Sequence, residues 1–308
     1  MQKSRTNNDS FRLSQGTYSF TNQMNRGLGL PYFEGWYHKI HISELQVTAI
    51  CIFGRMAFKG KKSSFVQVAT SNDMFSTIYE YPFEDLVVKN NHIEVNKHSF
   101  SSNHLKVELP DFSINITSNN NSNTTIKSAI GLKKFVPFVN CKHEVLLDNK
   151  NANLDLNTSN LSYSGTAHHY LETSWGNTFP DEYYWLHAHS FNCNKTSFFI
   201  AQGTPRFMGI PNQQFMGYLK TEKETYIFHP RNSKLAICSQ TKKIQIQAKK
   251  TQVLVTYSNG TPISLLAPFE GELSHPVVEH VNVSVGILLK NKRGTEEYYS
   301  KAGSWENN

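Results

Sequence analysis

The chain has 308 residues, enough for one large or two ordinary domains, each with a buried core. Charged residues make up 18% and aromatic residues 12%, and short apolar runs separated by Asn, Ser, Gly and Pro favour an all-β chain over a helical one. The net charge of +7 is spread along the chain without a nucleic-acid-binding motif, so no nucleic-acid partner is expected. The surplus charge is explained either by lysines that discourage pairing at exposed strand edges or by transient contact with an anionic membrane surface.

The N-terminal half reads as a polar arm followed by closely spaced strands. Residues 1–28 lack the apolar core of a secretory signal and are expected to form the arm. Asn119–Asn123 is expected to be a turn, and 132–140 an edge or bend because of Pro137. Strands are expected at Tyr32–Ile42, Leu45–Phe58, Ser64–Thr70, Ser76–Glu80, Leu86–Val88, His92–Val95, His104–Leu109, Phe112–Ser118, Thr124–Ile130, His143–Leu147, Ala152–Asn157 and Asn160–Gly165.

The C-terminal half continues in the same way. Strands are expected at His168–Trp175, Tyr183–Asn192, Thr196–Gln202, Gln214–Lys220, Glu224–His229, Leu235–Ser239, Lys243–Ala248, Gln252–Tyr257, Ile263–Ala267, Val277–Lys290 and Glu297–Ala302. No segment of useful length has helical periodicity, so two meander barrels or sandwiches are predicted. We place the N-terminal domain at 29–165 and the C-terminal domain at 166–308.

Cysteine usage and hydropathy indicate the compartment. The four cysteines (Cys51, Cys141, Cys193, Cys238) are widely spaced and are expected to be buried, reduced thiols of a cytoplasmic protein. No stretch approaches 18 apolar residues, so no membrane-spanning helix is expected, although contact at a membrane periphery fits the charge.

A first candidate site surrounds Glu34. In a strand, Tyr32, Glu34, Trp36 and His38 lie on one face, and burial among aromatic rings would raise the pKa of the carboxyl. Gly35 would let a ligand or another backbone come close. Glu34 is therefore either a catalytic acid or a carboxylate that pins a strand crossing.

A second candidate site combines two strands. Glu172 shares a face with His168 and Tyr170, where it is either a tuned acid or a residue that fixes the Trp175–Gly176 turn. On the next strand, a row of rings on one face either lines a pocket for a flat apolar ligand or fills a core; these are Tyr183, Trp185, His187, His189 and Phe191.

Other chemistries receive less support from the sequence. His187 and His189 together with His143, His168 or Glu172 form an alternative metal site of permissive spacing. No Gly-x-Ser-x-Gly, P-loop or dinucleotide-binding fingerprint occurs, so no nucleophile of that type and no nucleotide site is expected. Neither a cofactor nor a metal is expected.

Four blocks in order resemble the tocopherol cyclase family. They are Phe33–Tyr37 (FEGWY), Val136–Phe138 with Cys141–His143, Tyr170–Pro180 (YLETSWGNTFP) followed by Tyr184–Trp185, and Ala302–Glu306. The chain departs from the family where His187 and His189 replace the more usual Gln and Asn, and at Asn140 and Glu144.

The resemblance implies a fold and a reaction. The fold would be a pair of lipocalin-like antiparallel β-barrels, and the reaction a chromanol ring closure in which a prenyl double bond of a hydroquinone is protonated and the phenol attacks the cation. Glu34 or Glu172 would be the acid, and His143 or one of the two strand histidines would orient the phenol. The substrate would contact Tyr32, Trp36, Tyr170, Trp175, Trp185, His187 and His189.

Two alternatives to this lipophilic substrate chemistry stay open. The same apolar cavity would serve a non-catalytic carrier of a quinone, carotenoid or fatty chain, and the same scaffold would serve an alkene hydratase.

Overall fold

A computed structural model describes residues 31–89, 92–118, 141–177, 182–193, 195–204, 206–207, 210–211, 213–269 and 272–308. Across them the chain is built from antiparallel strands, and its one helical segment there is a 3-10 turn at Phe83–Asp85. The all-β prediction is confirmed. The arm at 1–28, the Asn119–Asn123 turn and the elements expected at 124–130 and 132–140 lie outside the described residues.

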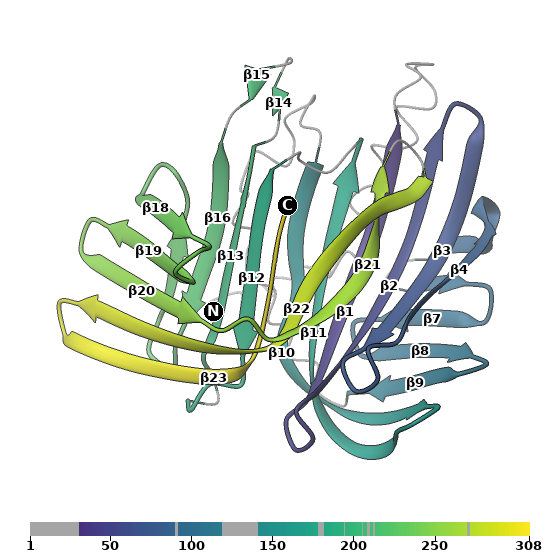
Figure 1. Ribbon diagram of the computed structural model, residues 1–308, viewed down its shortest axis with the longest axis horizontal. Helices are drawn as coiled ribbons and strands as arrows, with labels where there is room; N and C mark the ends of the chain where they lie inside the picture. The colour runs from purple at the N-terminus through teal and green to yellow at the C-terminus, as the bar shows by residue number, and fades with distance from the viewer. Residues whose placement is uncertain are drawn as a thin grey trace, which may run out of the picture.

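Eleven described strands form the first sheet, in the order β4-β3-β2-β1-β11-β10-β9-β8-β7-β6-β5 (Figure 1). They are β1 (Tyr32–Ile42), β2 (Val47–Phe58), β3 (Lys61–Thr70), β4 (Ser76–Pro82), β5 (Leu86–Lys89), β6 (His92–Val95), β7 (His98–Ser101), β8 (His104–Leu109), β9 (Phe112–Thr117), β10 (Cys141–Thr158) and β11 (Ser162–Gly176).

The first sheet curls around its own core. The ring of Phe100 on β7 lies 4.9 Å from that of Phe53 on β2 and 5.9 Å from that of Trp36 on β1, centroid to centroid. The outer strands alternate between this core and solvent, as β8 shows, because only one of their faces is covered. The sheet therefore curves around an apolar interior, with β4 and β5 as its two edges.

The second sheet has the strand order β17-β16-β13-β12-β23-β22-β20-β19-β18, with β21 paired to β22. The second-half strands are β12 (Tyr183–His189), β13 (Ser197–Gly203), β16 (Gln214–Lys220), β17 (Thr225–Phe228), β18 (Ser233–Cys238), β19 (Lys243–Ala248), β20 (Thr251–Tyr257), β21 (Thr261–Phe269), β22 (Glu272–Asn291) and β23 (Gly294–Asn307); β14 (Arg206–Phe207) and β15 (Ile210–Pro211) form a separate pair. A core that includes Ile200, Val255 and Trp305 lies inside this sheet.

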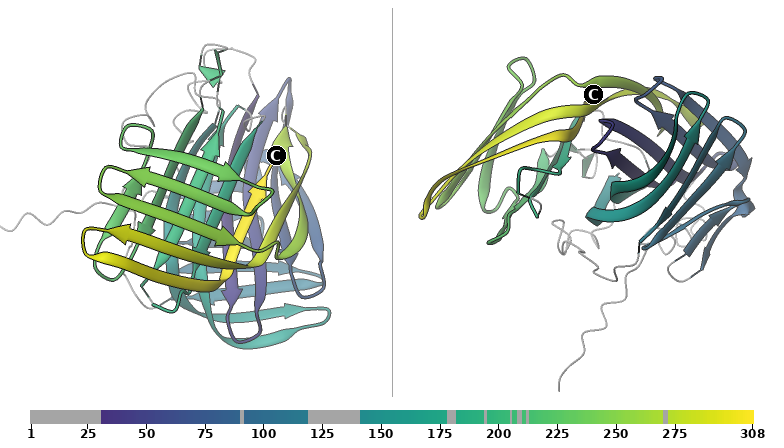
Figure 2. Two further views of the ribbon diagram at one scale, coloured as in Figure 1. Left: turned by 60° about the vertical axis from the view of Figure 1, so that its left-hand side comes forward. Right: turned by 90° about the horizontal axis from the view of Figure 1, so that it is seen from below.

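The two sheets pack against each other along β1, β10 and β11 of the first and β12, β13 and β16 of the second, and also where β2 and β3 meet β21 and β22 (Figures 1 and 2). Val145, Tyr170, Trp185, Phe199 and Tyr218 pack together there. Strand β1 is buried on both faces, one toward the first core and one toward the second sheet. This junction is where polar side chains from distant strands converge.

Two details differ from the sequence-based boundaries. The predicted domain cut at 165 falls inside β11, whereas the chain passes from one sheet to the other between Gly176 and Tyr183. The two strands expected at 143–157 are one long strand, β10. Its pairing with β11 continues through the polar residues in the middle of this segment by means of register shifts between Val145 and Lys150.

The cysteines are free thiols, and their burial differs from the expectation. Cys51 is buried, Cys141 and Cys193 are half-buried, and Cys238 is exposed. Burial raises the pKa of the Cys141 thiol to about 12, so this side chain is not a reactive thiolate. Within the described part of the chain, no helix has the length and apolar character to cross a bilayer.

Candidate active site

The register of β1 against β11 separates the predicted site residues into two groups. Glu34 pairs with Trp175, and Tyr37 pairs with Glu172. Directly paired residues share a face of the sheet, and faces alternate along a strand. Tyr32, Glu34, Trp36 and Trp175 therefore lie on the face of the first core, whereas Tyr170 and Glu172 lie on the face toward the second sheet.

On the first face, Glu34 is the centre of a buried ion pair. Its Oε2 accepts a hydrogen bond from Tyr32 Oη at 3.0 Å and two from Arg55, at 3.2 Å from Nε and 2.7 Å from Nη2. Glu34 is 1% exposed and Arg55 6%. Burial alone would lower the pKa of Arg55, but the charge of Glu34 outweighs it and raises that pKa. The geometry resembles a strand-crossing clamp more closely than a proton donor.

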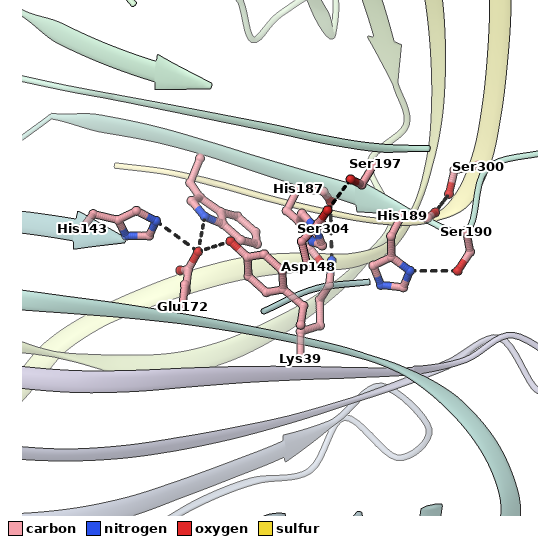
Figure 3. Close-up of polar contacts among 12 residues, drawn as sticks. Lys39, His143, Asp148, Glu172, His187, His189, Ser190, Ser197, Ser300 and Ser304 are labelled. Carbon is pink, nitrogen blue, oxygen red and sulfur yellow. Dashed lines mark hydrogen bonds and ion pairs between the residues drawn. The ribbon is translucent and has the colours of Figure 1, made fainter. Parts of the chain in front are cut away.

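On the opposite face, Glu172 lies in a network drawn from both sheets (Figure 3). Its Oε2 accepts hydrogen bonds from Tyr170 Oη and from Trp185 Nε1, the latter at 3.0 Å, and lies 3.2 Å from His143 Nε2. None of the described residues bonds to Oε1, and 11% of the Glu172 side chain is exposed. One carboxylate oxygen is thus held by protein, while the other is available to a substrate.

These contacts keep Glu172 ionised. Burial alone would raise its pKa, but the charge of His143 and the hydrogen bonds from His143, Tyr170 and Trp185 outweigh burial and lower the pKa below its usual value. The His143 ring is itself fixed, because Nδ1 lies 3.0 Å from Ser174 Oγ and the ring stacks on Phe199 at 5.5 Å. Glu172 and His143 form a positioned carboxylate–imidazole pair.

Deeper in the junction lies a buried lysine that the sequence analysis did not single out. Lys39 is 1% exposed, and its Nζ donates to Ser304 Oγ at 3.2 Å and to the carbonyl of His187 at 3.5 Å. It lies 5.9 and 5.8 Å from the ring centroids of Tyr170 and Trp185. Burial lowers the pKa of Lys39 to about 8, although nearby carboxylates oppose the shift.

The strand histidines are also deep in this junction. His187 stacks on Tyr170 with ring centroids 3.7 Å apart, and its Nε2 lies 3.5 Å from Asp148 Oδ1. The ring of His189 lies 5.3 Å from that of His187 and 5.4 Å from that of His168. Burial lowers the pKa of His187 to about 4 and also lowers that of His189, so both rings are neutral at pH 7.

Two further carboxyls face the junction from the second sheet. Glu279 on β22 accepts a hydrogen bond from Tyr37 Oη at 2.6 Å, and burial raises its pKa to about 7. Glu306 on β23 pairs with Trp185 and accepts a hydrogen bond from Tyr183 Oη. Alternation within Ala302–Glu306 could have placed Glu306 on the face of Ser304, but nothing local in the sequence indicates which strand it would meet.

The metal alternative finds no support in the geometry. Among the described residues, no three His, Cys, Asp or Glu side chains are arranged to hold one ion. The histidines of the predicted metal site do not converge. His143 contacts Glu172 and is partly exposed, whereas His187 and His189 are completely buried.

The sequence from 112 to 306 matches the family model described as tocopherol cyclase-like. The chain belongs to the tocopherol cyclase-like family. This match confirms the family resemblance and spans three of the four sequence blocks; the Phe33–Tyr37 block lies before the matched range. A comparison with curated protein sequences gives no match.

Solved structures with this fold support the same architecture. An AttH candidate from Nitrosomonas europaea matches with a TM-score of 0.52 at 10% identity, covering 90% of this chain and 92% of that one. CghA in complex with Sch210972 matches with a TM-score of 0.57 at 9% identity, covering 90% and 88%. The similarity extends over both sheets and confirms the two-domain, lipocalin-like fold expected for the family.

Proposed function

We propose that this member of the tocopherol cyclase-like family closes a ring on a prenylated hydroquinone or a related isoprenoid, using the junction around Glu172. The observation that carries the proposal is the Glu172 carboxylate, which is held through Oε2 by Tyr170, Trp185 and His143, while none of the residues that the structure describes bonds to Oε1. A buried carboxylate with a shifted pKa beside an imidazole is typical of a site that moves protons.

The surroundings of Glu172 suit a cationic intermediate. Protonation of a trisubstituted double bond gives a tertiary cation, which the free oxygen of Glu172 and the π face of Trp185 would stabilise. The aromatic walls exclude water, which would otherwise add to the cation. Attack by the substrate hydroxyl then closes the ring, and the hydroxyl proton passes to the His143–Glu172 pair, so that the reaction is an isomerisation without net gain or loss of atoms.

The hydratase alternative uses the same protonation but ends with addition of water. Trp185 and Tyr170 are 9% and 0% exposed, and this dry environment favours attack by a group of the substrate itself over attack by water. The carrier alternative needs an apolar surface but no proton-transfer groups, and the Glu172–His143 contact is unnecessary for it. We therefore favour the ring-closing reaction.

One experiment separates the three functions. Purified protein is incubated with geranyl-trimethylhydroquinone, and the products are analysed by mass spectrometry. A cyclase gives a product of unchanged mass with one fewer free phenol, a hydratase gives a product heavier by one water, and a carrier retains the unchanged compound in a stoichiometric complex.

Variants connect the reaction to the site. Glu172→Gln should slow ring closure about 100-fold, whereas Glu297→Gln, a change at an exposed position on β23, should leave it intact. A wild-type protein that does not convert the prenylated compound would contradict the proposal, whether or not it retains the compound.

A further inference from the structure

Glu306 differs from the other buried acids at the junction in what surrounds it. It lies directly opposite Trp185 in the β12–β23 pairing, so it shares the face that also carries the Glu172 network. Its Oε1 accepts a hydrogen bond from Tyr183 Oη, and the side chain is half-buried. In the described part of the chain no cation pairs with Glu306, whereas Glu34 has Arg55 and Glu172 has His143.

The electrostatic surroundings push the two acids of this face in opposite directions. Burial raises the pKa of Glu306 to about 8, and the negative charge of Glu172 adds to the shift. The pKa of Glu172 is lowered, as its contacts with His143 and two ring donors outweigh burial. Two carboxyl groups whose surroundings separate their proton affinities are the usual arrangement of an acid with a base or charge stabiliser.

We propose that Glu306 is the general acid of this site, and that Glu172 is its ionised counterpart. This assignment rests on the proposed ring closure. The Glu306 carboxyl gives its proton to the less substituted carbon of the double bond, and the electron pair of the double bond forms the new C–H bond. The substrate hydroxyl attacks the resulting cation, and its proton returns through the His143–Glu172 pair or directly to the Glu306 carboxylate.

Glu279 is a weaker candidate for the same role, although burial also raises its pKa. It is 1% exposed and is hydrogen-bonded by Tyr37, and the ammonium of Lys39 opposes its protonation. Glu306 is half-buried and lies opposite Trp185 in the strand pairing. Of the two carboxyls whose pKa burial raises, Glu306 is therefore the more accessible to an entering substrate.

A titration tests the protonation state of Glu306 without any substrate. Protein labelled with ¹³C at the glutamate carboxyl carbons is titrated by NMR, and Glu306→Gln assigns the signal. We expect one midpoint near pH 8 that disappears in Glu306→Gln. In Glu172→Gln the midpoint should move to lower pH, because the neighbouring negative charge is removed. The groups around Glu306 whose own titration must be followed are Tyr37, Tyr183 and Glu172. An ordinary midpoint below pH 5 would overturn the assignment.

Turnover tests the catalytic role. With geranyl-trimethylhydroquinone, Glu306→Gln should lower kcat by about 100-fold or more with little change in KM, the usual effect of losing a general acid. Glu306→Asp should recover part of the activity, and Glu297→Gln should match the wild type. If the wild type turns over and Glu306→Gln turns over equally well, Glu306 is not the acid and the ring-closing function stands. If the wild type does not turn over at all, the proposed function itself fails.

Discussion

Two buried glutamates on neighbouring strands share the same local sequence and have different surroundings. Each follows a tyrosine by two residues, and in each pair the tyrosine hydroxyl bonds to the carboxylate, Tyr32 to Glu34 and Tyr170 to Glu172. Their faces of the sheet are opposite, because Glu34 pairs with Trp175 and Tyr37 pairs with Glu172. The local Tyr-x-Glu motif therefore has two different environments in one sheet.

The cation beside each glutamate accounts for the difference. Arg55 carries a permanent charge and lies directly opposite Glu34 in the strand pairing, so this ion pair stabilises the contact between β1 and β2. His143 Nε2 lies 3.2 Å from Glu172 Oε2, and among the described residues none bonds to the other oxygen of Glu172. A guanidinium partner suits a structural carboxylate, and an imidazole partner suits a catalytic one.

The largest expected effect comes from breaking the Glu34 pair. Arg55→Met leaves the Glu34 carboxylate buried and without its guanidinium, so the free energy of unfolding should fall by about 3–5 kcal/mol. Urea denaturation measures it. The matched control is Arg293→Met, which removes an exposed 3.3 Å pair with Glu224 and should cost less than about 1 kcal/mol. Equal losses in the two variants would contradict a buried structural role for Arg55.

The second effect separates the two glutamates by activity. Glu172→Gln should lower kcat about 100-fold, equivalent to about 2.7 kcal/mol of transition-state stabilisation, with little loss of stability. Glu34→Gln should lower the melting temperature and leave kcat within a few-fold of the wild type. Both are measured by steady-state turnover of geranyl-trimethylhydroquinone and by thermal unfolding. The reverse result would identify the Arg55-paired carboxylate as the catalytic one.

A third effect concerns the pH dependence of stability. Because the pKa of Lys39 is about 8 in the folded protein and near its ordinary value of about 10.5 when unfolded, the unfolded chain binds more protons between these values. The contribution of Lys39 to stability should therefore rise as pH increases from 8 to 10.5 and be lowest below pH 8.

A variant isolates this contribution. Lys39→Met should remove it, and the difference in unfolding free energy between variant and wild type should change over that window by on the order of 3 kcal/mol. The unfolding free energy of Lys301→Met, a change at an exposed position on β23, should have the same pH dependence as that of the wild type. If Lys39→Met also has the wild-type pH dependence, the amine is not desolvated in the folded protein.

The sequence predicted the strands and the family, but not which residues meet. Alternation correctly placed Tyr32, Glu34 and Trp36 on one face of β1, because that relation is local. Whether Glu172 joins that face depends on the register of β1 against β11, which is set by pairs of residues far apart in the chain. Arg55, Lys39 and Glu306 were missed for the same reason. The role of each depends on contacts with another strand, and the local sequence does not indicate which strand that is.

The smallest effect tests where a substrate would lie on the Glu172 face. Gly35 pairs with Ser174 on that face, and a Cβ built there would have one heavy atom within 4 Å, the Phe53 carbonyl oxygen at 3.7 Å. Gly35→Ala should therefore keep or slightly raise stability, by up to about 1 kcal/mol, because a strand glycine is costly to order. The neighbouring Gly54 is the control, since a Cβ there would lie 2.3 Å from the Phe65 ring, and Gly54→Ala should destabilise by about 1–3 kcal/mol.

If the open space at Gly35 receives the substrate, Gly35→Leu should raise KM about tenfold while the protein remains folded. An unchanged KM in that variant would place the substrate on the other side of Glu172, toward Trp185 and Glu306.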